Sequence, residues 1–335
     1  MKMDIIIIGS NEEWSKYSWL YYVEMFDNVH YDNMRNISSY KMINRIFQFH
    51  FSLKINNKIK LPGKSIWYKK ICSRLNISNN AILFFYDWNM LSGDLKFLEF
   101  LKKSYPKTRL VYIFTNLVDK SGAFKYSYLN KLKKSYDYVV AFDEKDSAKY
   151  GFYYHPLIFN INVESQYEND TYDLCFCGKA KTSSRLNQIH EVYKKAKEEG
   201  LNTWFLIHGV DECNQLSESD IIYNSKIHFK DYLNIINKSR CVVDITQDNS
   251  SALPLNIVAA LVMNKKLITN NKVIENYSFY SPSNILLTSS NNSYSNFIQI
   301  PYIPNSSKTI SMFSLESLLK TLNINVELIN NRRYK

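Results

Sequence analysis

The stretch that decides the fold is YDLCFCGKAKTSSRL, residues 172–186. It opens with a run of strand length, Tyr172–Cys177, and passes through a short basic loop that contains Gly178. Apolar side chains then recur at helical spacing over Ser184–Glu199, and Gly200 follows as a suitable left-handed cap. A buried strand that leads through a glycine-containing loop into an amphipathic helix is the repeating unit of a parallel α/β sheet.

The same alternation continues on both sides of this stretch. Near-continuous apolar runs predict strands that are buried on both faces, and longer amphipathic runs predict helices between them. Besides the segments above, the predicted strands cover 4–8, 81–86, 110–114, 138–142, 203–209, 241–246 and 266–269, and the predicted helices cover 14–26, 95–104, 127–135, 230–238, 255–263 and 315–322, with one or two more within 36–61.

A break in this alternation predicts the domain organisation. The segment that begins at Lys149 is extended and then polar, without a helical period. A chain of 335 residues also exceeds the length that one hydrophobic core usually serves. We therefore predict an α/β fold of two Rossmann-like domains facing a cleft, residues 1–160 and 161–335. Ligands of such sheets bind at the carboxyl ends of the strands.

The net charge of +11 suits an anionic partner. Zinc-finger spacing, an RRM-like aromatic signature and a dense basic helix are all missing, which argues against nucleic acid. Lysine pairs spread along the chain are typical of a solvated surface, or of a domain that rests on anionic lipid. The apolar run at 5–8 is too short for a signal peptide or a membrane span. We expect a cytoplasmic protein that can lie peripherally at the inner face of the plasma membrane.

Cysteines and histidines point away from a metal site. The five cysteines are odd in number and show no framework spacing, and Cys175 and Cys177 lie within an apolar strand, so we predict free thiols. No two of the six histidines stand at metal-ligand spacing, so we predict no metal and no cofactor. The patterns GxSxG, GxxxxGK[ST] and GxGxxG do not occur, which excludes three common catalytic or nucleotide-binding motifs.

The first candidate site is the loop after the strand at 172–177. Gly178 would let the backbone turn tightly, and the helix N-terminus would offer N–H groups to an anion. Lys179, Lys181 and Arg185 can neutralise a diphosphate. The alternative is an ordinary strand–helix turn with surface lysines. We interpret the loop as a phosphate site.

The second candidate site is DITQDNSS, residues 244–251, which leads from a strand end into a helix through Pro254. Small hydroxyl and amide side chains there can bond a phosphate and sugar hydroxyls, although Ser250 or Ser251 would equally serve as a helix cap. The candidate donor-binding residues are Gln247, Asn249, Ser250, Ser251 and, in the helix, Asn256.

Candidates for a general base lie at predicted strand ends in the first half. Such a base must lie within hydrogen-bond reach of the hydroxyl that it deprotonates. Asp87 directly follows a buried strand and has Trp88 beside it as a sugar-stacking surface; a solvated turn aspartate is the alternative. We predict Asp87 and Glu13 as catalytic residues, ahead of Glu12, Asp143 and Glu144 at similar positions.

With these residues in hand, the chain resembles bacterial glycosyltransferases of the GT-B superfamily that build capsule, O-antigen or other surface glycans. The resemblance is clearest over residues 136–290. It rests on DYVVAFDEKDSAKYGFYYHP (137–156), YDLCFCGKAKTSSR (172–185), HFKDYLNIINKSRCVVDIT (228–246), LPLNIVAALVMNKKLITNN (253–271) and FYSPSNILL (279–287).

The resemblance implies a metal-independent transferase. Its donor would be a UDP- or dTDP-sugar bound by the second domain, and its acceptor a glycan or lipid-linked glycan at the first. Lys179, Lys181 and Arg185 would stabilise the leaving diphosphate. Backbone groups near Tyr223 would contact the nucleobase of the donor.

One departure from the family pattern keeps an alternative open. Relatives carry an arginine or similar residue early in the last donor-site helix, and an acidic residue one turn later that holds the ribose. Asn256 and Ala259 stand at these positions. A non-catalytic sugar-nucleotide-binding or partner subunit is therefore the alternative function. A nucleotide-sugar epimerase would need more carboxylates and histidines than the second half offers.

Overall fold

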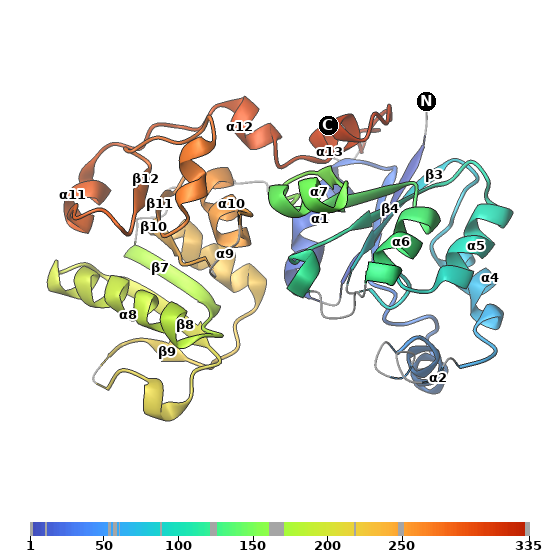
Figure 1. The fold of residues 1–335 in the computed structure, drawn as a ribbon, viewed down its shortest axis with the longest axis horizontal. Helices are drawn as coiled ribbons and strands as arrows, with labels where there is room; N and C mark the ends of the chain where they lie inside the picture. Colours follow the sequence, from blue (N-terminus) through green and yellow to red (C-terminus); the bar gives the residue numbers. More distant parts are fainter. Residues whose placement is uncertain are drawn as a thin grey trace. The chain divides into compact units, whose positions relative to one another are not determined.

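The computed structural model describes residues 3–10, 12–52, 55, 59, 61–87, 89–120, 126–160, 171–217, 219–246 and 251–331. The chain divides into two compact units, drawn in Figure 1. The first unit comprises Met1–Asn160 together with Leu315–Lys335, and the second comprises Ile161–Ser314.

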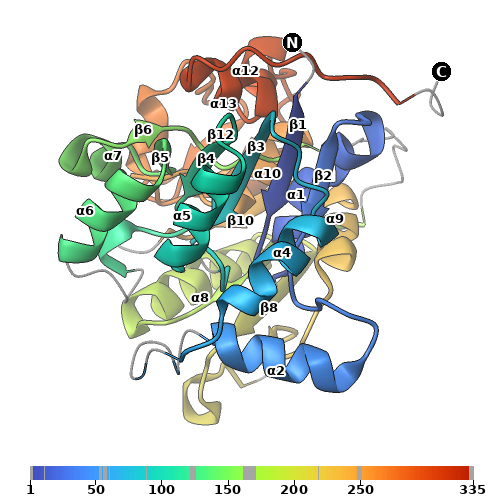
Figure 2. The ribbon, with the colours of Figure 1, turned by 90° about the vertical axis from the view of Figure 1, so that its right-hand side faces the viewer.

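The first unit is built on a six-stranded parallel sheet in the order β2-β1-β3-β4-β5-β6. Alternate residues of β1 face opposite sides of the sheet, as the period of a strand requires. Ile6 and Ile8 pack under one layer of helices, and Ile5 and Ile7 under the other. Figure 2 shows α4, α5 and α6 covering one face. The strands are β1 (Asp4–Ile8), β2 (Val29–Asp32), β3 (Ala81–Tyr86), β4 (Arg109–Ile113), β5 (Tyr138–Ala141) and β6 (Tyr153–Tyr154), and the helices are α1 (Glu13–Met25), α2 (Lys41–Phe51), α4 (Ser65–Arg74), α5 (Leu95–Ser104), α6 (Tyr126–Ser135), α7 (Glu144–Tyr150) and α13 (Leu315–Thr321).

The second unit repeats the architecture with another six-stranded parallel sheet, in the order β12-β11-β10-β7-β8-β9. Gly200 has a φ of +72°, which confirms the predicted left-handed cap after the helix of the deciding stretch. The strands are β7 (Tyr172–Lys179), β8 (Thr203–His208), β9 (Ile222–Tyr223), β10 (Ser239–Asp244), β11 (Lys266–Thr269) and β12 (Ile285–Leu287), and the helices are α8 (Ser183–Glu198), α9 (Phe229–Asn237), α10 (Leu255–Val262), α11 (Tyr294–Gln299) and α12 (Ser307–Ser311).

The last residues, which the sequence led us to assign to the second domain, belong to the first unit. The apolar face of α13 packs with Trp19 and Tyr22 of α1 under the first sheet. The Leu315 amide donates to the Tyr22 hydroxyl at 2.9 Å, and Asn28 bonds the backbone of Glu327 and Ile329. Amphipathic spacing predicts that a helix covers a core, but it does not say which core.

Both sheets contain a point where the strand order reverses. In the first sheet the chain passes from β1 outward to β2 and returns to the other side of β1 as β3. In the second it proceeds from β7 to β8 and β9, and then places β10 on the other side of β7. Loops that leave the carboxyl ends of the two central strands diverge there, and ligands of open α/β sheets bind at this position.

Among the described residues, no helix is long and apolar enough to cross a membrane.

Candidate functional site

The reversal point of the second sheet brings the two predicted donor loops together. β7 and β10 are adjacent parallel strands, with Cys175 paired to Val242, so the segments that follow them leave from the same edge. We call this edge the second switch site and define it by Gly178, Lys179, Arg185 and Asp244. Of the predicted donor residues, Gln247, Asn249 and Ser250 lie outside the described residues.

Arg185 is the most informative side chain of this site. It lies in the first turn of α8, and its backbone N–H donates a hydrogen bond to Oγ1 of Thr182, the N-cap residue, at 3.3 Å. A Cβ atom on Gly178 would lie 3.5 Å from Arg185 Nη2, so the guanidinium reaches back along the strand. Arg185 Nε is buried and has no hydrogen-bond partner within the described part of the chain. An unsatisfied, half-buried N–H donor on a cation is suited to binding an anion.

Asp244, the last residue of β10, supplies the counter-charge. It is 1% exposed and accepts a hydrogen bond from Thr246 Oγ1 at 2.8 Å. Burial raises the pKa of this carboxyl, while Thr246 and the charge of Arg185 lower it. Burial likewise lowers the pKa of Arg185, and Asp244 opposes that shift. Asp244 belongs to the second candidate loop but had no predicted role; the signal in the sequence is a carboxylate at the end of an apolar strand.

The two lysines add positive charge at the same edge. Lys179 ends β7, is exposed, and is paired with His208 of β8 in the sheet register. The pKa of His208 is lowered, first by burial and then by the neighbouring Lys179. Lys181 is exposed two residues later, just before α8. The basic cluster expected here is therefore present, with only Arg185 partly withdrawn from solvent.

Gly178 has a different role from the predicted one. β7 continues through Lys179, and Gly178 is not among the glycines with positive φ, so it does not make a tight turn. A Cβ atom at this position would instead lie 3.0 Å from Phe176 Cζ. The position therefore favours a residue without a Cβ atom because the Phe176 ring lies close to the strand, with the Arg185 guanidinium at contact distance beside it.

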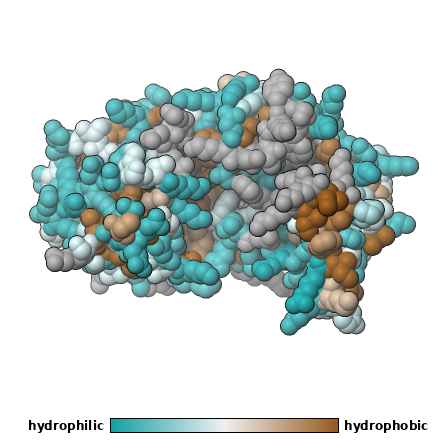
Figure 3. Space-filling view, turned by 60° about the horizontal axis from the view of Figure 1, so that its bottom comes forward, coloured by the Kyte–Doolittle hydropathy of each residue, from teal (hydrophilic) through white to brown (hydrophobic). Residues whose placement is uncertain are grey.

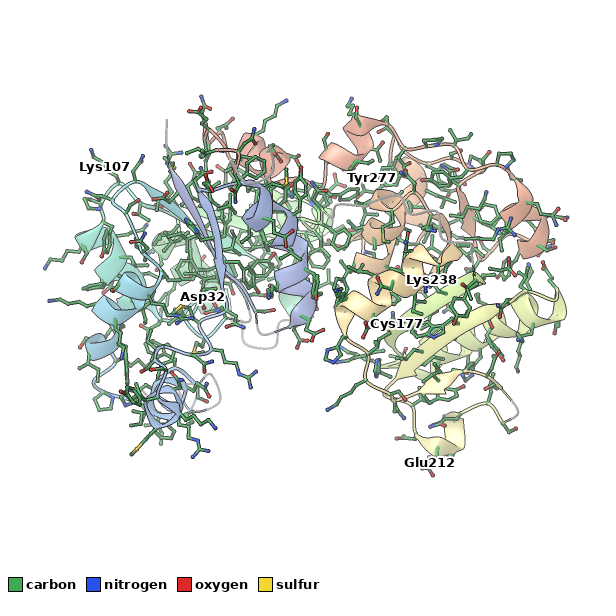
Figure 4. All side chains as sticks on the ribbon, turned by 180° about the vertical axis from the view of Figure 1, so that it is seen from behind. Asp32, Lys107, Cys177, Glu212, Lys238 and Tyr277 are labelled. Carbon is green, nitrogen blue, oxygen red and sulfur yellow. The ribbon has the colours of Figure 1, made fainter. Side chains whose placement is uncertain are left out.

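Three other predicted donor residues have side chains engaged within the unit. Asn256 donates to the backbone oxygen of Cys177 at 3.1 Å and accepts from Tyr232 at 3.0 Å, which ties α10 to β7 (Cys177 is labelled in Figure 4). The Tyr223 hydroxyl accepts from the Leu216 amide at 3.1 Å and lies 3.0 Å from His190 Nε2. Ser251 is buried. The contact predicted at Tyr223 was between its backbone and the nucleobase of the donor. In the sheet, Tyr223 is paired with Ile207.

A polar clasp that the sequence did not reveal supports the second switch site. Asn270, directly after β11, accepts from the Thr246 amide at 2.8 Å and donates to Gln188 of α8 at 2.8 Å. It therefore holds the start of the loop after β10 against the helix that carries Arg185. Two asparagines after an apolar strand were the only sign of it in the sequence.

The reversal point of the first sheet carries the predicted catalytic carboxylates, and we call Ser10, Asp87, Asn89 and Thr115 the first switch site. Asp87 follows β3, is 7% exposed, and accepts from Thr115 Oγ1 at 2.6 Å. It is therefore not a solvated turn residue. Asn89 donates to the Gly9 backbone oxygen at 2.6 Å, which holds the loops after β1 and β3 side by side.

The other carboxylates differ from Asp87 in their surroundings. Glu13 is the exposed first residue of α1, after the loop that follows β1. Asp143 caps α7 by accepting from the Asp146 amide at 3.0 Å, so it has a structural role. Trp88 lies outside the described residues.

The thiols and possible metal ligands are dispersed. All five cysteines are free, as predicted, and burial raises the pKa of both Cys175 and Cys177 to about 12. Within the described ranges, no group of three or more His, Cys, Asp or Glu side chains is placed to hold a metal ion.

Solved structures resemble this chain in fold. No protein-family model matches it, and no curated protein does so. An α-glucosyltransferase solved with UDP and a 13-mer DNA containing an HMU base is 11% identical, with a TM-score of 0.59 over 96% of this chain and 100% of that one. A UDP-forming α,α-trehalose-phosphate synthase from Burkholderia xenovorans is 10% identical, with a TM-score of 0.51 over 96% and 99%.

A third match is partial. TarM of S. aureus is 13% identical, with a TM-score of 0.45 over 73% of this chain, and the match spans 55% of that protein. The two matches that extend over nearly the whole chain confirm the predicted fold, two α/β units of the GT-B type. At these identities the likeness concerns the fold alone.

Proposed function

We propose that the protein is a glycosyltransferase that moves a sugar from a UDP- or dTDP-linked donor to a glycan or lipid-linked acceptor in surface-polysaccharide synthesis. The observation that carries the proposal is the buried, unpartnered Nε of Arg185 at the second switch site. Lys179 and Lys181 add two exposed cations in the same loop. This combination suits a ligand with two adjacent phosphates.

The reaction follows from where the charges lie. The bond between the anomeric carbon and the diphosphate oxygen breaks, and the electron pair leaves with the diphosphate. Arg185, Lys179 and Lys181 stabilise the charge that develops there, which makes a metal ion unnecessary in this proposal. The acceptor oxygen forms the new bond to the anomeric carbon, and its proton passes to a carboxylate of the first unit, Asp87 or Glu13.

The structural neighbours support a uridine nucleotide as the first ligand to test. The α-glucosyltransferase was solved with UDP, and the trehalose-phosphate synthase is described as UDP-forming. The buried carboxylate of Asp244 supports the site electrostatically, since its negative charge raises the pKa of Arg185 and so opposes the effect of burial.

One observation favours a second function, a subunit that binds a sugar nucleotide without catalysis. Ala259 of α10 is 1% exposed, so no acidic side chain is offered where the resemblance places the ribose contact. A binding subunit would show nucleotide affinity without turnover. A transferase releases the nucleotide diphosphate from its donor.

Calorimetry against UDP, dTDP, ADP and GDP, with and without EDTA, tests the proposal. We expect binding of one diphosphate class at about micromolar Kd, unaffected by EDTA. If none of these nucleotides binds, the donor-site assignment is wrong.

A double variant tests the residues. Lys179→Ala with Arg185→Ala should weaken binding of the selected nucleotide at least about tenfold, because charge-assisted hydrogen bonds to phosphate are lost. Lys194→Ala with Lys308→Ala is the matched control, since both side chains are exposed in the second unit and the same charge is removed. Equal affinities for the two double variants would move the phosphate site elsewhere.

A further inference from the structure

The net positive charge of the chain comes almost entirely from one segment of the first unit. Residues 33–86 contain ten lysines and arginines and no aspartate or glutamate. The other 32 basic residues nearly balance the 31 acidic residues of the chain. Basic residues are spread along the chain, but this segment lacks acidic residues and so carries almost the whole net charge of +11.

Helix α2 lies within this basic segment, and its inner face is fully used in packing. The Asn44 side chain accepts from the amides of Ile37 and Ser38 at 2.8 and 2.9 Å, which anchors the loop before the helix. Phe47 is buried against Trp67 of α4, with ring centroids 5.5 Å apart. Trp67 Nε1 also donates to His50 Nδ1 at 2.7 Å. These contacts hold α2 without help from its outer face.

The outer face of α2 is apolar where solvent should favour polar side chains. Met42, Ile46 and Phe49 recur at the i, i+4, i+7 spacing of one helix face and are 75%, 43% and 52% exposed. Tyr40, just before the helix, is 70% exposed. A contiguous exposed apolar patch marks an interaction surface. In Figure 3 hydrophobic atoms gather at the right, on the part of the first unit that carries α2.

Basic side chains accompany this apolar row. Lys41 and Arg45 are exposed on α2, and Lys69 and Lys70 are exposed on α4. Ile66 of α4 adds another exposed apolar side chain, 67% exposed. We call Tyr40, Lys41, Met42, Arg45, Ile46 and Phe49 the α2 face. A helix with an apolar row and flanking cations is the pattern of an element that lies in a membrane interface.

We propose that the α2 face docks the protein onto an anionic lipid bilayer. Met42, Ile46 and Phe49 enter the boundary between headgroups and acyl chains, and Lys41 and Arg45 meet the anionic headgroups. A second copy of the chain is a poor occupant, because two such faces would bring like charges together. Nucleic acid would satisfy the cations, but it offers no apolar phase to the three central side chains.

Vesicle flotation of the full chain tests the docking directly. We expect binding to phosphatidylcholine vesicles that contain about 30% phosphatidylglycerol, weaker binding at higher salt, and none to phosphatidylcholine alone. Met42→Ser, Ile46→Ser and Phe49→Ser together should lower the affinity at least about tenfold, because the apolar area that enters the interface is lost. The changes affect exposed positions, so thermal unfolding should stay near that of the unaltered protein.

A charge-reversal pair isolates the electrostatic part. Lys41→Glu with Arg45→Glu should also lower the affinity about tenfold, and the loss should shrink at high salt. Lys103→Glu with Lys107→Glu is the matched control: the same charge change at two exposed positions elsewhere on the first unit, with Lys107 labelled in Figure 4. The control pair should keep most of the binding.

Several results would overturn the proposal. Failure of the unaltered protein to bind anionic vesicles is one, and equal binding by the triple serine variant is another. Self-association in sedimentation that the triple variant abolishes, without any vesicle binding, would reassign the face to a dimer. Duplex DNA binding that survives the triple variant, again without vesicle binding, would reassign the basic segment to nucleic acid. Vesicle binding needs no nucleotide, so it is independent of the proposed transferase activity.

Discussion

The two switch sites occupy the same topological place in two sheets, yet they are built from opposite charges. Asp87 lies where the strand order of the first sheet reverses, between β1 and β3. Arg185 lies at the corresponding point of the second sheet, between β7 and β10. Parallel α/β topology thus determines where chemistry occurs, and side chains decide which charge is presented.

The two sites also present different hydrogen-bonding groups. In the first, Asp87 accepts from Thr115, and Asn89 bridges two loops through the Gly9 backbone oxygen. In the second, Arg185 Nε is buried without a partner in the described structure, and two lysines beside it are exposed. This contrast suits a second site that receives an anion, and a first site that holds a carboxylate in a fixed orientation.

The largest expected effect comes from neutralising the first site. Asp87→Asn keeps an oxygen that accepts from Thr115 but removes the proposed base, so the rate of sugar transfer should fall by about 10²–10⁴. Nucleotide affinity should stay unchanged, since we propose that the nucleotide binds at the second site. Release of nucleotide diphosphate from the donor measures the rate, and calorimetry measures the affinity.

Asp143→Asn is the matched control for this change. Asp143 also follows a strand of the first sheet, but it caps α7, and asparagine caps a helix equally well. Transfer at an unaltered rate in Asp87→Asn would leave Asp87 as a support of the first sheet, with Glu13 the next carboxylate to neutralise.

Much of the fold follows from local patterns. β3, α5 and β11 have the bounds that apolar runs and helical spacing predict, and α8 and α10 differ by a residue or two. Elements with weaker patterns were not predicted, among them β2 (Val29–Asp32) and the ten-residue helix α4. The position of α13 depended on contacts between the ends of the chain, which periodicity does not encode.

The candidate site was predictable in composition but not in geometry. Basic residues after the deciding strand indicated a cluster, and Gly178 indicated a special position. The structural setting of Gly178, the close approach of the Phe176 ring, can be found only from coordinates. The electrostatic effect of Arg185 and Asp244 on each other's pKa joins residues far apart in the sequence. By contrast, the segment 33–86, which has no acidic residue, can be found in the sequence by counting basic and acidic residues separately.

A smaller effect concerns a titratable group enclosed in the first unit. His155 follows β6, is buried, and donates through Nδ1 to the Pro156 oxygen at 2.7 Å. Burial lowers its pKa to about 4, although the bond to Pro156 raises it. In the unfolded chain the His155 imidazole binds a proton as the pH falls through about 6.5, whereas in the folded chain it stays neutral until about pH 4. Stability is therefore complete above pH 6.5 and should fall by roughly 3 kcal/mol as pH drops to 4.

Urea unfolding at a series of pH values measures this loss. His155→Gln should flatten the dependence between pH 6.5 and 4, whereas His30→Gln, at an exposed position on β2, controls for removal of a histidine. His190 and His208 of the second unit, whose pKa values are also lowered, should retain a residual slope. A dependence that His155→Gln leaves intact would place the titrating groups in the second unit.

The smallest effect compares the glycines at the two central strands. A Cβ on Gly9 would lie 2.2 Å from the Tyr31 hydroxyl, which donates to the Ser10 oxygen, so Gly9→Ala must displace that ring and should cost about 1–3 kcal/mol of stability. A Cβ on Gly178 would meet the fully buried Phe176 at 3.0 Å and Arg185 Nη2 at 3.5 Å.

Gly178→Ala should therefore shift the Phe176 ring by a few tenths of an ångström and bring a methyl group against the Arg185 guanidinium, which should weaken nucleotide binding by about threefold at a stability cost of about 1 kcal/mol. Gly9→Ala should leave nucleotide affinity unchanged, so each variant controls for the other in calorimetry and thermal unfolding. Equal losses of affinity would mean that both glycines act through stability alone. The contrast between an anion-receiving site and a carboxylate-holding site would then lose its residue-level support.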